Sequence, residues 1–171
     1  NTTWTRELQA RAARIRILLC DVDGVLTDGG LYYSGDEGFA VRFDVKDGLG
    51  LVLARKAGLI TGIISARQHP EAHRRARDLG LSEVHLDVED KRSVLDEILT
   101  RHGLAAEECC YVGDDLVDLP VLTAVGLPIA VCDAVAAVRD VARWITTQPG
   151  GRGAVREVVE HLLAARRGEL P

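Results

Sequence analysis

The sequence predicts an α/β fold, with a parallel sheet that carries helices on both faces and a small β-hairpin insertion. Short apolar runs of strand length alternate with helix-prone segments along most of the 171 residues. Short connections join these segments, which is typical of parallel strands linked by crossover helices. Acidic residues follow directly after two of the apolar runs, where sheets of this kind place their ligands. The expected architecture is therefore Rossmann-like.

The first half of the chain begins with a polar helical segment and an apolar strand. Gly58 and Gly80 each follow a helix-prone segment, and glycine commonly ends a helix. The apolar residues between these helices, up to Ile64, form a run of strand length. The expected elements are a helix over residues 5–14, a strand over 15–20, a hairpin over 29–44, a helix over 47–57, a strand over 59–64 and a helix over 70–79.

The expected hairpin differs in character from the segments around it. Phe39, Val41 and Phe43 alternate with other residues, a period of two that is typical of a strand. The Leu-Tyr-Tyr run at residues 31–33 can pair with them across the turn-rich residues 34–38. The sequence therefore predicts two short antiparallel strands at this point.

The second half of the chain continues the alternation of strands and helices. Val94, Leu95, Ile98 and Leu99 recur at helical spacing, and Gly103 follows the last turn. The expected elements are a strand over residues 83–86, a helix over 90–102, a strand over 108–112, a helix over 116–125, a strand over 127–131, a helix over 135–141, a short strand over 144–145 and a closing helix over 154–167.

The composition is that of an ordinary globular domain. Hydrophobic residues make up 47% of the chain and charged residues 27%, and the length favours one domain over residues 1–171. The net charge of −5 argues against a general nucleic-acid surface or an anionic-membrane surface. No apolar run has the length of a membrane span, and no signal peptide is recognised. We therefore expect a cytoplasmic protein.

The four cysteines are Cys20, Cys109, Cys110 and Cys132. Three of them lie in apolar, strand-like runs, and none has the spacing of a Cys-x-x-Cys pair. We interpret them as reduced, buried small hydrophobic residues of a cytoplasmic protein, with a zinc site as the less favoured alternative.

Two carboxylates, Asp21 and Asp23, follow the first apolar strand and precede Gly24. If this strand is buried in a parallel sheet, both acids emerge at its carboxyl end. Acids crowded at one point repel each other unless a cation neutralises them. The pattern predicts a divalent metal site with oxygen ligands, and Mg²⁺ is the ion that suits it best.

Other polar residues follow later strands and are expected at the same edge of the sheet. They are Ser65, Lys91, Asp114 and Asp115. One carboxylate can attack phosphorus, and a second can protonate the leaving oxygen and then activate water. A hydroxyl and an ammonium group can hold the phosphate oxygens. The residue types therefore indicate phosphoryl transfer.

Four motifs of this sequence resemble those of the haloacid dehalogenase superfamily of phosphatases. They are the run Asp21-Val22-Asp23-Gly24-Val25-Leu26-Thr27, Ser65, Lys91, and the run Gly113-Asp114-Asp115-Leu116-Val117-Asp118. Residues 44–48 and 150–157 are similar to a smaller family within it, the phosphatases of 3-deoxy-D-manno-octulosonate 8-phosphate. The likeness spans about residues 15–165, and the two acidic runs together make it specific.

The resemblance implies a Mg²⁺-dependent phosphomonoesterase that acts on this sugar-acid phosphate, a step in lipopolysaccharide precursor synthesis. It implies that Asp21 is the nucleophile and a metal ligand. It further implies that Asp23 is the general acid and base and binds the metal through its backbone carbonyl, and that Asp114 is the third protein ligand. The implied phosphate and substrate contacts are Asp23, Gly24, Asp44, Val45, Lys46, Asp47, Gly48, Ser65, Arg67, Arg75 and Lys91, with Ser65 and Lys91 also catalytic.

The sequence departs from the family pattern at three positions. Val52 stands where relatives often have an arginine, Ala66 replaces a common glycine, and Lys46 replaces a frequent arginine. A lysine cannot pair with a carboxylate in the bidentate way that arginine does. None of the three positions touches the chemistry, but they leave a nine-carbon keto-deoxy sugar acid 9-phosphate open as the substrate.

The small insertion has a consequence for assembly. Larger members of the superfamily close a cap domain over the site, whereas this chain has only the hairpin, which carries Tyr32, Tyr33, Phe39 and Phe43. The resemblance implies a homotetramer in which hairpins pack together and the tail over residues 149–171 completes a neighbouring site. Residues 150–153, rich in glycine, are expected to be a flexible joint in that tail, and Arg152 and Arg156 are either solubility charges or active-site residues.

Other interpretations remain open for individual residues and for the whole chain. Asp115 and Asp118 are expected to cap and order their loop rather than bind metal. His69 and His73 have metal-ligand spacing, yet an exposed helix face is the more economical interpretation. Two other functions remain open for the whole chain: a non-catalytic domain of the same fold that serves tetramer assembly, and a phosphate-receiving signalling domain. Neither explains the converging charges at the strand ends as well as phosphate hydrolysis does.

Overall fold

Six parallel strands form the centre of the molecule, in the spatial order β5-β4-β1-β6-β7-β8. The computed structural model describes residues 3–33, 39–68 and 70–169. The strands of the sheet are β1 (Ile17–Cys20), β4 (Ile60–Ile64), β5 (Glu83–His85), β6 (Cys109–Gly113), β7 (Leu127–Ala130) and β8 (Trp144–Ile145). Every neighbouring pair is parallel, which confirms the predicted α/β class.

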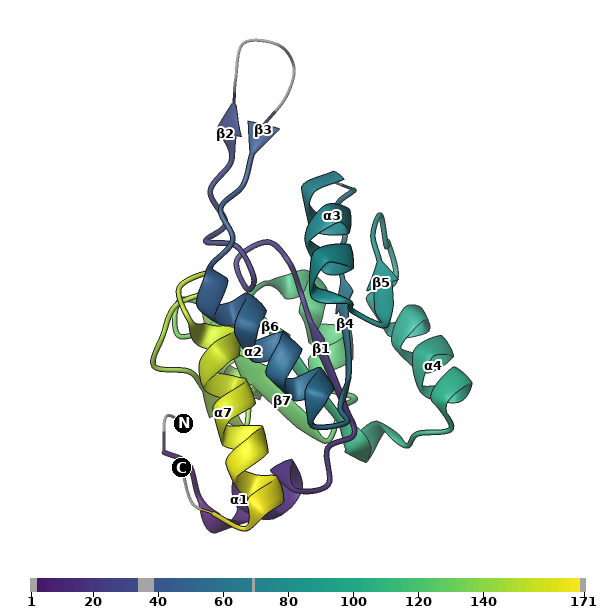
Figure 1. The fold of residues 1–171 in the computed structure, drawn as a ribbon, viewed down its shortest axis with the longest axis vertical. Helices are drawn as coiled ribbons and strands as arrows, with labels where there is room; N and C mark the ends of the chain where they lie inside the picture. Colours follow the sequence, from purple (N-terminus) through teal and green to yellow (C-terminus); the bar gives the residue numbers. More distant parts are fainter. Residues whose placement is uncertain (1–2, 34–38, 69, 170–171) are drawn as a thin grey trace.

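The helices form two packed groups around this sheet. In Figure 1, α2 and α7 run side by side in front of the strands, and α1 packs against α7. In the second group, α5 packs against both α4 and α6. The bounds are α1 (Arg6–Ala12), α2 (Val45–Lys56), α3 (Pro70–Leu79), α4 (Lys91–His102), α5 (Leu119–Leu122), α6 (Ala136–Val141) and α7 (Ala154–Arg167). None of the described helices combines the length and the apolar character needed to cross a bilayer.

The hairpin is present but shorter than expected. Its strands are β2 (Tyr32–Tyr33) and β3 (Phe39–Ala40), which pair in antiparallel fashion and project from the body of the molecule in Figure 1. Phe43 pairs with Thr27 in an isolated bridge instead of extending the hairpin. The predicted turn at residues 34–38 lies outside the described residues.

Two helix predictions need correction. Helix α2 begins at Val45, two residues earlier than expected, because the Asp44 side chain accepts the Lys46 backbone N–H at 2.8 Å and caps the helix. The helix expected over residues 116–125 is instead a 3₁₀ turn, η2 (Leu116–Asp118), followed by the short α5. The Asp118 carboxylate turns back to accept backbone N–H groups and so tightens the first turn.

The central strands are buried along their whole length, and the core extends from them into both groups of helices. All four cysteines are free. Cys20, Cys109 and Cys110 are buried in the sheet, as expected, and Cys132 is half-buried. Burial raises the pKa of the three buried thiols, which keeps them protonated and unreactive.

The glycine-rich segment before α7 is not the flexible joint that the sequence suggested. It packs on the loop that carries the first acidic motif, where the Gly151 N–H donates to the Val25 carbonyl at 2.8 Å. A Cβ atom at Gly150 would lie 1.7 Å from the carbonyl oxygen of Gly24, so only glycine allows this approach. The end of the chain therefore supports the loop after β1.

Asp47 of α2 fastens the start of α7 to the same region. Its carboxylate is buried and accepts the backbone N–H groups of Gly153 at 3.1 Å and Arg156 at 2.9 Å. These are two of the N–H groups that the first turn of a helix cannot bond internally. Asp47 therefore caps α7 from a neighbouring helix.

Replacing Asp47 with alanine is expected to lower the free energy of unfolding by about 2 kcal/mol, since two buried N–H groups lose their acceptor. Urea unfolding at neutral pH measures the change. The control is Asp140→Ala, which removes an exposed carboxylate from α6 and should change stability by less than about 0.5 kcal/mol. Equal stability of the two variants would contradict the capping role.

Candidate active site

The predicted strand-end residues meet at one edge of the sheet. Asp21 follows β1, Ser65 follows β4 and Asp114 follows β6, and these three strands are neighbours. They line a cavity of about 250 Å³. Its walls are Asp21, Asp23, Gly24, Gly29, Ser65, Ala66, Arg67, Asp114, Asp115 and Val117.

Lys91 reaches the same point from the first turn of α4. Its ammonium group lies 2.9 Å from Oδ1 of Asp21 and 2.8 Å from Oδ1 of Asp118, and only 3% of the residue is exposed. Burial alone would lower the pKa of Lys91, but the charges of Asp21 and Asp118 raise it above its ordinary value. The amine therefore stays charged, although it lies at a helix N-terminus that disfavours cations.

Asp118 is fully buried, and both of its carboxylate oxygens are already used. Oδ1 accepts hydrogen bonds from Lys91 and from the hydroxyl of Tyr111, the latter at 2.7 Å. Oδ2 accepts the backbone N–H groups of Asp114 at 2.9 Å and Asp115 at 3.3 Å. This confirms that Asp118 orders the loop after β6, and it leaves Asp118 poorly suited to bind a metal.

Asp21 and Asp114 are crowded, buried carboxyl groups whose pKa values are raised. Burial and the nearby charge of Asp118 raise the pKa of Asp21 to about 7, although Lys91 lowers it in part. Burial and the charges of Asp21 and Asp118 raise the pKa of Asp114 to about 8. Each carboxyl group therefore keeps its proton to a higher pH than an ordinary aspartate does, unless further positive charge is supplied between them.

The geometry at these two acids fits a divalent cation. Oxygen atoms of Asp21, Asp114 and Asp118 lie within 4.8 Å of one another. Oδ1 of Asp114 is buried and has no hydrogen-bond partner among the described residues. A Cβ atom at Gly24 would lie 2.0 Å from Oδ2 of Asp114, so the glycine makes room for this carboxylate. Hard oxygen donors with an uncompensated negative charge are what Mg²⁺ binds.

Asp23 and Ser65 both line the cavity. The Asp23 carboxylate is partly exposed and lies 3.9 Å from Nε of Arg67. The Ser65 hydroxyl is buried and accepts the Arg67 backbone N–H at 3.2 Å. The guanidinium of Arg67 also lies over the ring of the hairpin residue Phe39, 5.4 Å from its centroid. Arg67 therefore links the hairpin to the rim of the cavity.

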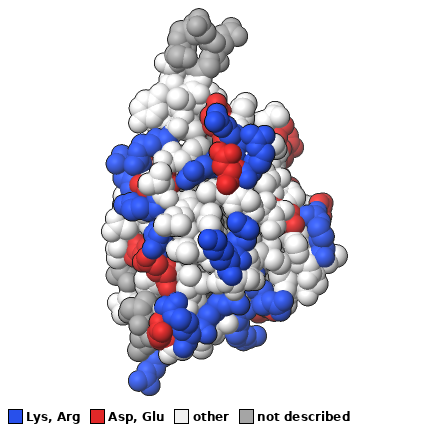
Figure 2. All heavy atoms as spheres, in the orientation of Figure 1, with Lys and Arg blue, Asp and Glu red and all other residues white. Residues whose placement is uncertain are grey.

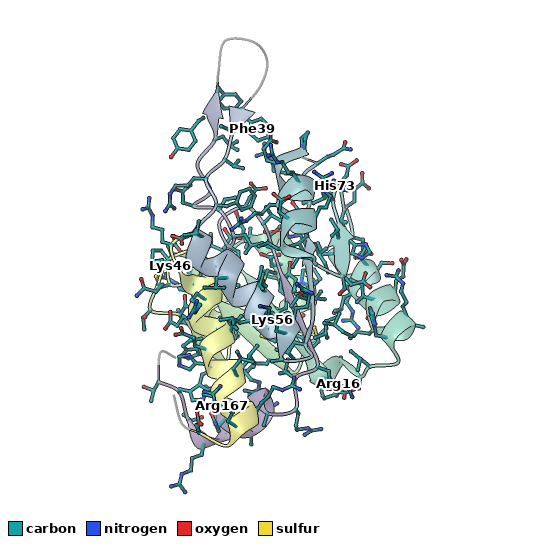
Figure 3. The ribbon with its side chains drawn as sticks, viewed as in Figure 1. Arg16, Phe39, Lys46, Lys56, His73 and Arg167 are labelled. Atoms are coloured by element: carbon teal, nitrogen blue, oxygen red, sulfur yellow. The ribbon has the colours of Figure 1, made fainter. Side chains whose placement is uncertain are left out.

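Most of the predicted substrate contacts lie outside this cavity, around the base of the hairpin. Asp44 caps α2, and its backbone carbonyl accepts a hydrogen bond from Arg75 at 3.2 Å. Gly48 packs against the same guanidinium, since a Cβ atom there would lie 2.1 Å from it. Val45 and Lys46 are exposed, and Figure 3 shows Lys46 near the start of α2, below the hairpin residue Phe39. Asp47, as described above, caps α7.

Sequence reasoning missed Arg42, which lies with these residues at the base of the hairpin. Its guanidinium donates to the Gly151 carbonyl at 2.7 Å and pairs with Asp44 at 3.3 Å and Asp28 at 3.8 Å. Asp28 also pairs with Arg152 at 3.4 Å. The signal was present in the hairpin alternation, where Arg42 is the charged residue between two apolar ones.

The remaining predicted residues fall away from the cavity or outside the described residues. Figure 2 shows lysine and arginine side chains spread over the visible face from the upper part to the lower end, with acidic side chains among them. His73 is exposed on α3, which agrees with the prediction that it lies on an exposed helix face. His69 lies outside the described residues. Arg156 pairs with Glu160 at 2.7 Å along α7.

The raised acid pKa values predict how metal-free protein responds to pH. Between about pH 4, where an unfolded aspartate titrates, and pH 7 to 8, the folded state retains protons that the unfolded chain has released. The free energy of unfolding should therefore fall as pH rises through this range. A saturating divalent cation replaces those protons and should remove most of the slope.

Thermal unfolding at several pH values, in EDTA and in excess Mg²⁺, measures this effect. In EDTA, Asp114→Asn should flatten the pH dependence relative to the unmodified chain, because one of the two titrating groups is gone. A midpoint that rises with pH in EDTA, or that ignores Mg²⁺ at alkaline pH, would contradict the charge balance described for Asp21 and Asp114.

Comparisons with known proteins point to one group of enzymes. Residues 86–158 match the haloacid dehalogenase-like hydrolase family. The chain is 40% identical to the 3-deoxy-D-manno-octulosonate 8-phosphate phosphatase KdsC of Yersinia pestis, over 91% of this chain and 83% of that protein. It is also 40% identical to KdsC of Escherichia coli strain K12, over 92% of this chain and 84% of that protein.

Solved structures agree with these sequence matches. The 3-deoxy-D-manno-octulosonate 8-phosphate phosphatase of Moraxella catarrhalis, in complex with magnesium ion, phosphate ion and KDO, superposes with a TM-score of 0.94. It is 36% identical and covers 96% of this chain and 95% of its own. The cobalt-bound phosphatase of Haemophilus influenzae superposes with a TM-score of 0.88 at 35% identity, covering 92% of each chain.

Proposed function

This chain belongs to the haloacid dehalogenase-like hydrolases, in the group of 3-deoxy-D-manno-octulosonate 8-phosphate phosphatases, and we propose that it hydrolyses this sugar-acid phosphate to the free sugar acid and orthophosphate. The observation that carries the proposal is the convergence of Asp21 and Asp114 on one cavity, with the Lys91 ammonium group 2.9 Å from Asp21. Such a cluster fits phosphoryl transfer. The relatives that are 40% identical to this chain are named as phosphatases of this sugar-acid phosphate.

The reaction proceeds through an aspartyl phosphate. The Asp21 carboxylate attacks phosphorus as the bond to the sugar oxygen breaks, and Asp23 donates its proton to that leaving oxygen. Asp23 then takes a proton from water, which attacks phosphorus and releases orthophosphate and Asp21. Lys91 and Ser65 hold the phosphoryl oxygens, because buried Ser65 lines the cavity and the buried Lys91 ammonium group lies 2.9 Å from Asp21, which also lines it.

Magnesium is the cofactor that we assign to this site. The Asp21 carboxylate, the Asp23 backbone carbonyl and the Asp114 carboxylate would hold it. When bound, Mg²⁺ supplies the positive charge that keeps Asp21 ionised and shields it from the phosphate. Lys91 supplies a second positive charge, 2.9 Å from Asp21, and so supports the same ionisation.

The substrate's carboxylate is best received by the cations at the mouth of the cavity and the base of the hairpin. Arg67 lines the cavity itself, and Arg75, Lys46 and Arg42 lie around the start of α2. Arginine pairs with a carboxylate in a bidentate manner, whereas Lys46 acts as a point charge. The phosphate end of the substrate therefore faces the acids, and its acidic end faces this basic group.

We also propose that the enzyme is a single-domain homotetramer whose hairpins pack together, and that it acts in the cytoplasm on a precursor of lipopolysaccharide. Tyr32 and Tyr33 support the assembly, because 58% and 78% of their surfaces are exposed. Aromatic side chains exposed on a projecting hairpin are typical of an interaction surface. Sedimentation velocity at micromolar concentration should show the tetramer, and a monomer alone would contradict it.

A phosphate-release screen over sugar phosphates, with and without Mg²⁺, tests the activity. The octulosonate 8-phosphate should be the best substrate, and EDTA should remove the activity. A clear preference for a nine-carbon keto-deoxy acid 9-phosphate would replace the substrate but keep the reaction. No release from any phosphomonoester with Mg²⁺ present would leave a non-catalytic role and refute the proposal.

A further inference from the structure

Tyr111 is the one residue of the buried strand β6 whose side chain ends in a hydroxyl. No part of it is exposed to solvent. Its hydroxyl donates to Oδ1 of Asp118 at 2.7 Å and lies 3.5 Å from the ammonium nitrogen of Lys91. A phenolic hydroxyl buried in an apolar strand costs free energy unless it is bonded, so this contact accounts for its presence there.

The contact determines how Asp118 meets Lys91. Oδ1 of Asp118 accepts two hydrogen bonds, from Tyr111 and from Lys91, which fills both of its lone pairs. Oδ2 is held by backbone N–H groups of the loop after β6. The carboxylate therefore has one orientation, and it shares its negative charge between a phenol and an ammonium group.

Loss of the phenolic hydroxyl would change that balance. Oδ1 of Asp118 would keep one empty lone pair in a buried site, and Lys91 would be drawn further toward Asp118. The ammonium group would then turn away from Asp21, which lies 2.9 Å on its other side. The position of the Lys91 ammonium group therefore depends on how strongly each of the two carboxylates, Asp21 and Asp118, attracts it.

We propose that Tyr111 is a positioning residue, which acts through Asp118 to hold the Lys91 ammonium group against Asp21 and the transferred phosphoryl group. The assignment rests on the proposed phosphatase activity. Tyr111 does not line the cavity. Its hydroxyl reaches Lys91 mainly through Asp118, by hydrogen bonds of 2.7 Å and 2.8 Å, beside a longer direct contact of 3.5 Å.

The test is Tyr111→Phe, which keeps the ring and removes only the hydroxyl. With Mg²⁺ and p-nitrophenyl phosphate as probe, kcat/KM should fall by about tenfold or more, the value expected for losing a hydrogen bond to a charged group. The inhibition constant of orthophosphate should rise as well, because Lys91 binds the phosphoryl oxygens before and during the reaction. Unchanged values for both, per folded enzyme, would overturn the proposal whatever the melting temperature.

Thr61→Val is the matched control. Thr61 lies on β4, is fully buried, and its hydroxyl has no hydrogen-bond partner among the described residues. Its removal should leave kcat/KM and orthophosphate inhibition unchanged. If Thr61→Val lowers kcat/KM as much as Tyr111→Phe does, the effect is a general one of altering a buried strand, and the proposal fails.

A double-mutant cycle with Asp118→Asn separates positioning from packing. Because Tyr111 acts through Asp118, adding Tyr111→Phe to Asp118→Asn should lower kcat/KM by less than about twofold further. Losses that multiply would show independent action and overturn the proposal. The probes do not depend on the sugar, so failure of the octulosonate substrate and failure of the Tyr111 role are separate results.

The unmodified protein offers a second measurement if Tyr111→Phe does not fold. A buried phenolic proton bonded to a carboxylate should give a slowly exchanging, downfield proton resonance. Its position should change when orthophosphate and Mg²⁺ bind, because Lys91 then gains a new partner. A resonance that does not move on binding would overturn the coupling between Tyr111 and the phosphoryl site.

Discussion

Asp21→Asn is expected to abolish phosphate release, with turnover no higher than background. A carboxamide is too weak a nucleophile to attack phosphorus and form the covalent intermediate. The fold should survive, because Lys91 keeps its 2.8 Å contact with Asp118 and the repulsion between Asp21 and the other two acids disappears. Orthophosphate release and thermal unfolding, measured on the same sample, check both parts of this result.

Two further measurements sharpen the result for Asp21. Rapid acid quench with a ³²P-labelled substrate should trap phosphate on the unmodified enzyme and none on the variant. The matched control is Asp140→Asn, the same change at an exposed acid of α6, which should leave turnover normal. Substantial residual turnover by Asp21→Asn would remove Asp21 from the role of nucleophile.

Asp23→Asn is expected to slow turnover by about a hundredfold or more, as loss of general acid and base catalysis should. The two halves of the reaction need Asp23 in opposite protonation states, since it first gives a proton to the sugar oxygen and then accepts one from water. The side chain is placed for both, because it lines the cavity, is partly exposed to water, and lies 3.9 Å from Nε of Arg67.

The leaving group separates these two steps for Asp23→Asn. A p-nitrophenolate ion leaves without protonation, so this variant should release a stoichiometric burst of it and then stall at the aspartyl phosphate. A sugar alkoxide needs the proton and should give no burst. Arg67→Gln is the control, because it removes the 3.9 Å neighbour of Asp23 without removing the acid, and it should retain the second step. Near-normal turnover of both substrates by Asp23→Asn would contradict the assignment.

The order and the type of the main elements could be predicted from local patterns. The helices α3 and α7 begin and end where the sequence indicates, because proline or glycine stands at their starts and glycine at their ends. The acids after β1 and β6 could likewise be placed at one edge, because parallel strands share a direction. The local sequence is therefore sufficient to predict the ends of these helices and the strand ends that carry the acids.

The helix after β6 and the glycine-rich tail were not predictable in the same way. Residues 116–125 have helical spacing, but Asp118 is held by Tyr111, Lys91 and the backbone of its own loop, and these contacts break the helix into two turns. The segment at residues 150–153 has the composition of a flexible joint, yet it packs against the loop after β1 and is capped by Asp47. In the first case Lys91 lies 27 residues from Asp118, and in the second Asp47 lies 106 residues from Gly153.

The sequence by itself determined which chemical groups this protein has and which strand end presents each of them. The tertiary structure alone decided their charge states and their partners. It placed an amine between two buried acids, a phenol behind one of those acids, and a glycine where the Asp114 carboxylate needs room. The physical reason is that burial and through-space distance set pKa values and hydrogen bonds, and neither quantity can be read from the order of residues along the chain.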